Sequence, residues 1–148
     1  MTRINLIHPS ELCDKHLMAE YRELIRIPNA VHQGKMQTYY HDAPKIYTLG
    51  AGHVKFFVDK LQFLHKRHQE LYNELVYREF NVTEIVWSED MIDFFKSKML
   101  YNDYTPTQDE IALNISRIID RMPINPKFTH RGEPMYYYFS GVWCNEYV

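Results

Sequence analysis

Long apolar runs, cysteine and glycine are all scarce in this chain of 148 residues. No stretch approaches the length of a transmembrane helix, and the start Met-Thr-Arg-Ile-Asn lacks the apolar run of a signal peptide. The two cysteines, Cys13 and Cys144, give neither a disulfide framework nor the spacing of a metal site. We therefore expect plain thiols in a reducing compartment and a cytoplasmic protein with no membrane partner.

Neither sign of charge dominates the chain, because its net charge is −2, which argues weakly against nucleic-acid binding. The charge is unevenly spread, however. Residues 1–78 carry 11 Lys/Arg against 8 Asp/Glu, whereas residues 79–148 carry 6 against 11. The first half therefore has a net positive charge and can present a local basic surface, although chance variation in surface charge explains the counts equally well.

Three segments of the chain show the periodicity of helices. The first runs from about Ser10, which can cap a helix, to Arg26, and Pro28 closes it. The second begins after the Gly50–Gly52 segment and continues to about Tyr77. Its apolar positions alternate steps of four and three, and they form one stripe of Phe57, Leu61, Leu64, His68, Leu71 and Leu75.

The third predicted helix follows Pro106 and opens with a T-x-x-E capping box at residues 107–110. Pro123 stops it. A shorter helix is expected near Glu89–Lys98 in the acidic and aromatic connection.

No linker, internal repeat or low-complexity tract divides the chain, so we expect one domain spanning residues 1–148. Residues 28–50 and 123–148 hold most of the proline, glycine and tyrosine and are predicted to be loops, since no strand or hairpin pattern is present. The predicted fold class is all-α, with three main helices, long loops and an aromatic C-terminal tail.

The first residues offer a nucleophile through processing. Initiator methionine is normally removed before a small residue such as Thr2. The α-amine that this exposes titrates near pH ~8, so a substantial fraction is neutral at physiological pH. Such an amine can form an imine with an electrophilic sugar carbon. Many chains begin Met-Thr without any such role, so a catalytic role for Thr2 needs support from other residues of the chain.

Charged side chains crowd one sector of the first predicted helix. Arg22 and Arg26 are four residues apart, Glu23 lies between them, and His16 lies two turns earlier on nearly the same face. A carboxylate ringed by guanidinium groups stays ionised and can act as a base, while the arginines hold phosphates. A solvated face of ordinary ion pairs has the same pattern.

On the third predicted helix, Asn114, Arg117 and Arg121 form a polar stripe opposite a row of isoleucines. Two arginines a turn apart suit a phosphodiester backbone, and ordinary surface arginines fit equally. The glycine pair before His53 can be a turn or a place where phosphate approaches a helix start. His68 falls on the apolar stripe, so we expect it to be packed rather than to bind metal with His65.

Several of these features occur together, in order, in one known family. The stretches are residues 1–6 (Met-Thr-Arg-Ile-Asn-Leu), 16–24, 49–54, 56–57, 59–60 and 103–106. They closely resemble the phage-type pyrimidine-dimer DNA glycosylase with abasic lyase activity, also called endonuclease V. The resemblance spans most of residues 1–122 and reappears in the aromatic tail.

The resemblance implies a repair enzyme that acts on double-stranded DNA carrying cyclobutane pyrimidine dimers, in a bacterial or phage-infected cell. The Thr2 amine would attack C1′ of the 5′ nucleotide of the dimer, and β-elimination would then break the strand. Glu23 matches the essential carboxylate of the family. The remaining matches are supporting or phosphate-binding residues: Arg3, His16, Arg22, Arg26, Arg117 and Arg121. No cofactor or metal is required, and a monomer is expected.

The chain departs from the family pattern in three places, and the last two of them leave the preferred lesion open. The stretch Val31–Lys45 has few basic residues, which should weaken scanning of undamaged DNA. The tail at residues 136–141 differs and is followed by extra residues, and residues 122–134 contain an insertion. The same imine chemistry on another damaged or modified base, or a non-catalytic DNA-binding module, are the alternatives.

Overall fold

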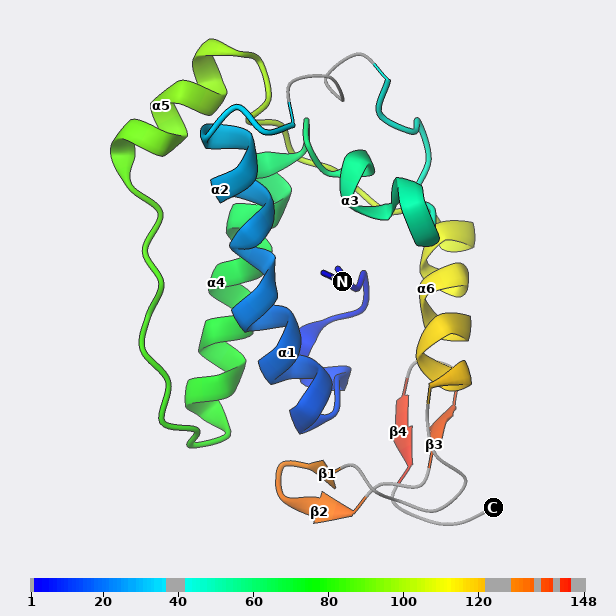
Figure 1. Ribbon diagram of the computed structural model, residues 1–148. Coiled ribbons are helices and arrows are strands. Elements are labelled where there is room, and N and C mark those ends of the chain that lie inside the picture. Colours follow the sequence, from blue (N-terminus) through cyan, green and yellow to red (C-terminus); the bar gives the residue numbers. More distant parts are fainter. Residues whose placement is uncertain (1, 37–41, 122–128, 135–136, 140–141, 145–148) are drawn as a thin grey trace.

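The structure, a computed structural model, describes residues 2–36, 42–121, 129–134, 137–139 and 142–144, with side chains through Glu133. The chain is mostly helical, as the sequence predicted (Figure 1). Its helices are α1 (Asp14–Leu24), α2 (Arg26–His32), α3 (His53–Phe56), α4 (Leu61–Tyr77), α5 (Glu89–Ser97) and α6 (Gln108–Asp120). No helix in the described part is long and apolar enough to cross a membrane.

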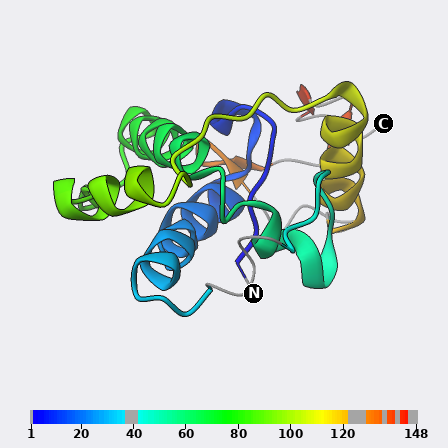
Figure 2. The ribbon, with the colours of Figure 1, turned by 90° about the horizontal axis from the view of Figure 1, so that it is seen from above.

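The N-terminal segment Thr2–Ile7 organises the arrangement of the helices. Helix α1 packs against α4, and α6 stands on the other side of this segment (Figures 1 and 2). Ile4 is fully buried, so the start of the chain belongs to the interior instead of trailing over the surface. The six stripe positions predicted for the second helix are all buried, and that prediction is confirmed.

The first helical region differs from the prediction at both ends. Helix α1 begins at Asp14 and is capped by the Cys13 sulfur, while Ser10 lies in a short 3-10 helix, Pro9–Glu11. The prediction that Pro28 closes the helix is wrong, because α2 contains it. Pro28 is the third residue of α2, where a backbone N–H has no partner within the helix, so the ring costs no hydrogen bond.

The predicted helix from residue 53 to Tyr77 is two helices, α3 and α4. Lys60 between them has non-helical backbone angles. The first N–H groups of α4 are taken up by another segment, since Leu61 N donates to Leu100 O at 3.1 Å and Phe63 N donates to Asn102 O at 3.2 Å. This tertiary pairing breaks the helix, and periodicity could not reveal it.

Helices α5 and α6 confirm their predictions closely. Helix α6 opens with a complete capping box, in which Thr107 and Glu110 each bond the other's backbone N–H. Helix α5 begins after Ser88, whose side chain accepts from Met91 N.

The expectation of no strands in the C-terminal region is wrong. Two short antiparallel hairpins form there, β1 (Thr129–His130) with β2 (Glu133–Pro134), and β3 (Tyr137–Phe139) with β4 (Val142–Cys144). The tight turn of the first hairpin is made by Arg131 and Gly132, which both have positive φ. Of the two, Gly132 is the residue type that readily adopts positive φ.

Candidate active site

A cavity of about 490 Å³ lies where α1, α6 and the N-terminal segment meet. The N-terminal segment and α1 supply Arg3, Asn5, Lys15, His16, Ala19, Glu20 and Glu23, and the end of α6 supplies Arg117, Ile118 and Arg121. Four cationic side chains therefore face two carboxylates and a histidine in one hollow. We call Arg3, Lys15, His16, Glu23 and Arg121 the rim of this cavity.

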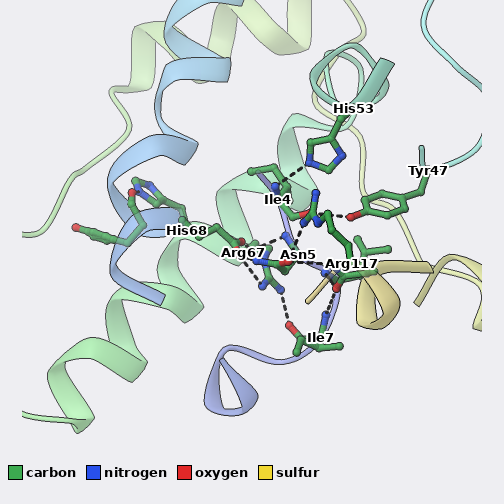
Figure 3. A network of polar contacts seen from close by, with 12 residues as sticks. Ile4, Asn5, Ile7, Tyr47, His53, Arg67, His68 and Arg117 are labelled. Atoms are coloured by element: carbon green, nitrogen blue, oxygen red, sulfur yellow. Dashed lines mark hydrogen bonds and ion pairs between the residues drawn. The ribbon is translucent and has the colours of Figure 1, made fainter. Parts of the chain in front are cut away.

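Behind the rim, side chains from several elements hold the N-terminal segment in place (Figure 3). His53 Nε2 accepts from Ile4 N at 2.8 Å, and Tyr47 OH donates to Ile4 O at 3.0 Å. Asn114 Oδ1 on α6 accepts from Leu6 N at 2.7 Å. The backbone around Ile4 thus has bonding partners on both sides, which fixes the path of the chain next to Thr2 and Arg3.

Glu20 on α1 anchors the same segment from the other side. Its Oε1 accepts from Asn5 Nδ2 at 2.7 Å. Arg67 on α4 donates to both carboxylate oxygens, from Nε to Oε2 and from Nη2 to Oε1. Arg67 Nη1 also donates to Ile7 O at 2.9 Å. Because Glu20 is 2% exposed and Arg67 is 5% exposed, this is a buried ion pair in which the carboxylate and guanidinium are compensated.

Asn5 links this pair to α6. Its side-chain oxygen accepts from Asn114 Nδ2 and from Arg117 Nη2, each at 2.8 Å. Arg117 is 9% exposed and also donates to Ile4 O at 3.4 Å. We call the set Asn5, Glu20, Arg67, Asn114 and Arg117 the inner wall.

His53 completes the support of the segment as a neutral ring. Its Nδ1 donates to Thr48 O at 2.9 Å, which leaves Nε2 as the acceptor for Ile4 N. Burial lowers the pKa of His53 to about 4, mainly by penalising the charged form. The preceding glycines make the turn that brings His53 here: a Cβ on Gly52 would lie 2.9 Å from the Thr48 methyl carbon.

The rim contrasts with the inner wall in its charge. Burial, followed by the charges of four surrounding cations, lowers the pKa of His16 to about 4. Burial and the charge of Arg121 likewise lower the pKa of Arg3, while Glu23 opposes the shift. Glu23 itself has a side chain 29% exposed, and its ion pair with Arg26 spans 3.9 Å.

Most residues that the sequence selected meet at this cavity. Arg3, His16, Glu23, Arg117 and Arg121 all line it. Thr2 directly precedes Arg3 and is 8% exposed in the chain that still carries Met1.

Two of the predicted arginines stand apart from the cavity lining. Arg22 is exposed, and Arg26, whose side chain is 65% exposed, reaches the cavity only through Glu23. Arg117 is not an ordinary surface arginine, because it is buried and belongs to the inner wall; its binding of phosphate stays a prediction.

Sequence reasoning missed several residues of the site. Glu20 and Arg67 are 47 residues apart, and no local pattern links them. Asn5 and Tyr47 were also missed, since each acts through a long-range contact. Lys15 was missed as well, although it lies next to His16 on the predicted helix, and this neighbourhood could have indicated that it lines the same cavity.

The histidines of α4 are packed, as predicted for His68. His68 Nε2 bonds Tyr21 O at 3.0 Å, and its Nδ1 accepts from Trp87 Nε1 at 3.0 Å. His65 stacks on the Trp87 ring at 4.6 Å. Among the described residues no group of His, Cys, Asp or Glu is suited to hold a metal ion. The side chains of the aromatic tail, and residues 122–128 of the insertion, lie outside the described part.

The N-terminal part of the chain matches a known protein family. Residues 1–88 match the model of the family described as pyrimidine dimer DNA glycosylase. The match contains the N-terminal segment, α1 and α4, while Arg117 and Arg121 on α6 lie beyond it. Because more than half of the 148 residues are matched, the chain belongs to the pyrimidine dimer DNA glycosylase family, whose members are repair enzymes acting on damaged DNA.

Proposed function

We propose that this chain is a bifunctional enzyme that removes a damaged pyrimidine from double-stranded DNA and then cleaves the strand at the abasic site. The α-amine of Thr2, freed by loss of Met1, is the nucleophile, and Glu23 is the acid–base group. One observation carries the proposal: Arg3, the residue after Thr2, lines the same cavity as Glu23, on a segment whose position is fixed by buried hydrogen bonds.

The proposed reaction has two stages. The amine attacks C1′ of the 5′ nucleotide of a pyrimidine dimer, and the glycosidic bond breaks with its electron pair going to the base, which takes up a proton. The nitrogen then loses a proton and forms an imine with C1′ as the C1′–O4′ bond of the sugar ring breaks and O4′ takes up a proton. The imine makes the C2′ proton acidic, Glu23 removes it, and the electron pair expels the 3′ phosphate. Water finally hydrolyses the imine and releases the enzyme.

The cations of the cavity have a separate task in this proposal. Arg3, Arg117 and Arg121 attract the phosphates that flank the reacting sugar, because guanidinium groups bind phosphate strongly. The exposed Arg22 and Arg26 extend this attraction over the neighbouring face of α1 and α2. Neutral His16 supports the rim as a hydrogen-bonding group. A monomer suffices, since one chain supplies every group.

The test begins with the intact mass of the purified protein, which reports whether Met1 is absent. That protein is then mixed with borohydride and duplexes carrying either a cyclobutane dimer or an abasic site. A covalent adduct with both duplexes supports the proposal. An adduct with the abasic duplex alone would limit the activity to the lyase stage, and an adduct with a different lesion would reassign the substrate. No adduct from protein that begins at Thr2 would overturn the mechanism.

Substitution of Thr2 separates the amine from its side chain. Thr2→Ser keeps a small residue, so Met1 is still removed and adduct formation should persist. Thr2→Gln keeps Met1 in place, so the amine is masked and the adduct should disappear. The two variants differ little in polarity, and their melting temperatures serve as the control for folding. Equal trapping by both variants would exclude the Thr2 amine as nucleophile.

A further inference from the structure

The cavity contains a cation that neither the motifs nor the family pattern selected, Lys15 in the first turn of α1. We propose that Lys15 binds a DNA phosphate at the α1 end of the cavity and is a further DNA-binding residue of the enzyme. This inference rests on the proposed function, since it requires DNA to enter this cavity.

The balance of charge in the cavity is the first support. Its lining has four cationic side chains, Arg3, Lys15, Arg117 and Arg121, and two carboxylates. One of the carboxylates, Glu20, is already engaged by Arg67 and Asn5. Among the described residues that line the cavity, Glu23 is the second carboxylate, so its lining carries more cations than carboxylates. Such a hollow has an excess of positive charge that an incoming phosphate would neutralise.

Mutual repulsion among these cations is the second support. Lys15 is one of the cations whose charge disfavours protonation of His16, together with Arg3, Arg117 and Arg121. All of them therefore act on the same ring in the cavity. A cluster of like charges costs stability in the free protein, and an anion shared by its members removes that cost.

The place of Lys15 on its helix is the third support. A cation in the first turn of a helix is opposed by the helix dipole, whose positive end lies there. The residue before it, Asp14, has the favourable charge, but its carboxylate is directed to the C-terminal hairpin. Asp14 accepts from Arg78 at 2.9 Å, from Thr129 at 2.5 Å and from the backbone N–H groups of Arg131 and Gly132 at 3.0 Å. Lys15 is thus a cation at a position where local stability favours an acid.

Binding of an uncleavable duplex tests the assignment. The duplex carries a tetrahydrofuran abasic-site analogue, and its affinity is measured over a range of salt concentrations. For Lys15→Gln we expect affinity to fall about tenfold near ~0.1 M salt and the slope of log K against log salt to flatten by about 0.9. Lys15→Arg should restore both values. The control is Lys98→Gln at the end of α5, which should bind like the wild type.

Thermal stability separates a binding role from a structural one. Lys15→Gln removes a repelled cation, so its melting temperature should equal or exceed that of the wild type. A lower melting temperature together with weaker binding would show that Lys15 supports the fold, and would overturn the assignment. Unchanged affinity and slope would overturn it as well.

The behaviour of the wild type shows whether a negative result concerns Lys15 or the proposed function as a whole. If the wild type binds the duplex and forms the borohydride adduct, any failure concerns Lys15 alone. If the wild type neither binds nor forms the adduct, the proposed function fails and this inference fails with it.

Discussion

The inner wall and the rim of the cavity both contain arginine and glutamate, yet these charges are compensated differently in the two regions. On the inner wall, Glu20 and Arg67 satisfy each other and also bond Asn5 and the Ile7 carbonyl. On the rim, like charges converge, and after burial they are the next cause that lowers the pKa of His16. The polar groups of the inner wall bond to the N-terminal segment and to one another, whereas the charged groups of the rim face the cavity, where a ligand can contact them.

Two glutamates on neighbouring turns of α1 show the difference most clearly. The Glu20 side chain is 1% exposed and is bound by the buried guanidinium of Arg67. The Glu23 side chain is 29% exposed, and its Oε1 lies 3.9 Å from Nη1 of the exposed Arg26. A buried, fully bonded carboxylate is poorly suited to exchange protons with a substrate. A partly exposed carboxylate on a rigid helix is well suited to it. The comparison supports a structural role for Glu20 and is consistent with the acid–base role proposed for Glu23.

The largest expected effect comes from Glu23→Gln. The amide cannot remove the C2′ proton, so strand cleavage should fall by roughly 10²- to 10⁴-fold while the affinity for DNA is retained. Single-turnover cleavage of an abasic duplex measures the first quantity, and binding of the tetrahydrofuran duplex measures the second. The melting temperature should stay close to that of the wild type, because Glu23 makes only a long, exposed ion pair. Undiminished cleavage would remove Glu23 from the mechanism.

The matched substitution on the inner wall, Glu20→Gln, should act on stability instead. It leaves the Arg67 guanidinium buried without its counter-charge, a change that costs about 3–5 kcal/mol. Urea unfolding measures this loss. The double variant Glu20→Gln with Arg67→Met should recover much of it, because the stranded charge is then removed as well. A stable single variant with impaired cleavage would reverse the roles assigned to the two glutamates.

The sequence predicted the rim better than the inner wall, for a physical reason. His16 and Glu23 lie on one helix, α1, so helical spacing alone places them together. The inner wall joins residues that are distant along the chain, such as Glu20 to Arg67 and Asn5 to Arg117. Such contacts depend on how the elements pack, and a single sequence carries no local trace of them.

The fold follows the same division. Helix α6 was predicted closely because its capping box and its stop are local signals. The break between α3 and α4 was missed because the residues that cause it, Leu100 and Asn102, come some forty positions later. Residue patterns thus predicted helices and charged faces, while the packing that fixes the N-terminal segment required the structure.

The smallest of these effects is the pH dependence of stability due to His53. His16 on the rim has a similarly low pKa, but the surrounding cations contribute to it as well as burial. The pKa of His53 is about 4 in the folded protein, against the usual 6.5. The unfolded chain therefore binds a proton first as the pH falls. The contribution of neutral His53 to stability is complete above about pH 6.5 and is lost progressively as the pH approaches about 4.

Urea unfolding of wild type and His53→Gln at about pH 7 and about pH 4 measures this contribution. Between these conditions the wild type should lose about 3 kcal/mol more than the variant, since glutamine does not titrate. The difference should persist at high salt, because burial is its main cause. For His16→Gln the corresponding difference should shrink with salt, because part of the shift comes from the rim cations. Equal salt sensitivity of the two histidines would contradict the distinction between His53, whose pKa is lowered mainly by burial, and His16, whose pKa is lowered by burial and also by the surrounding cations.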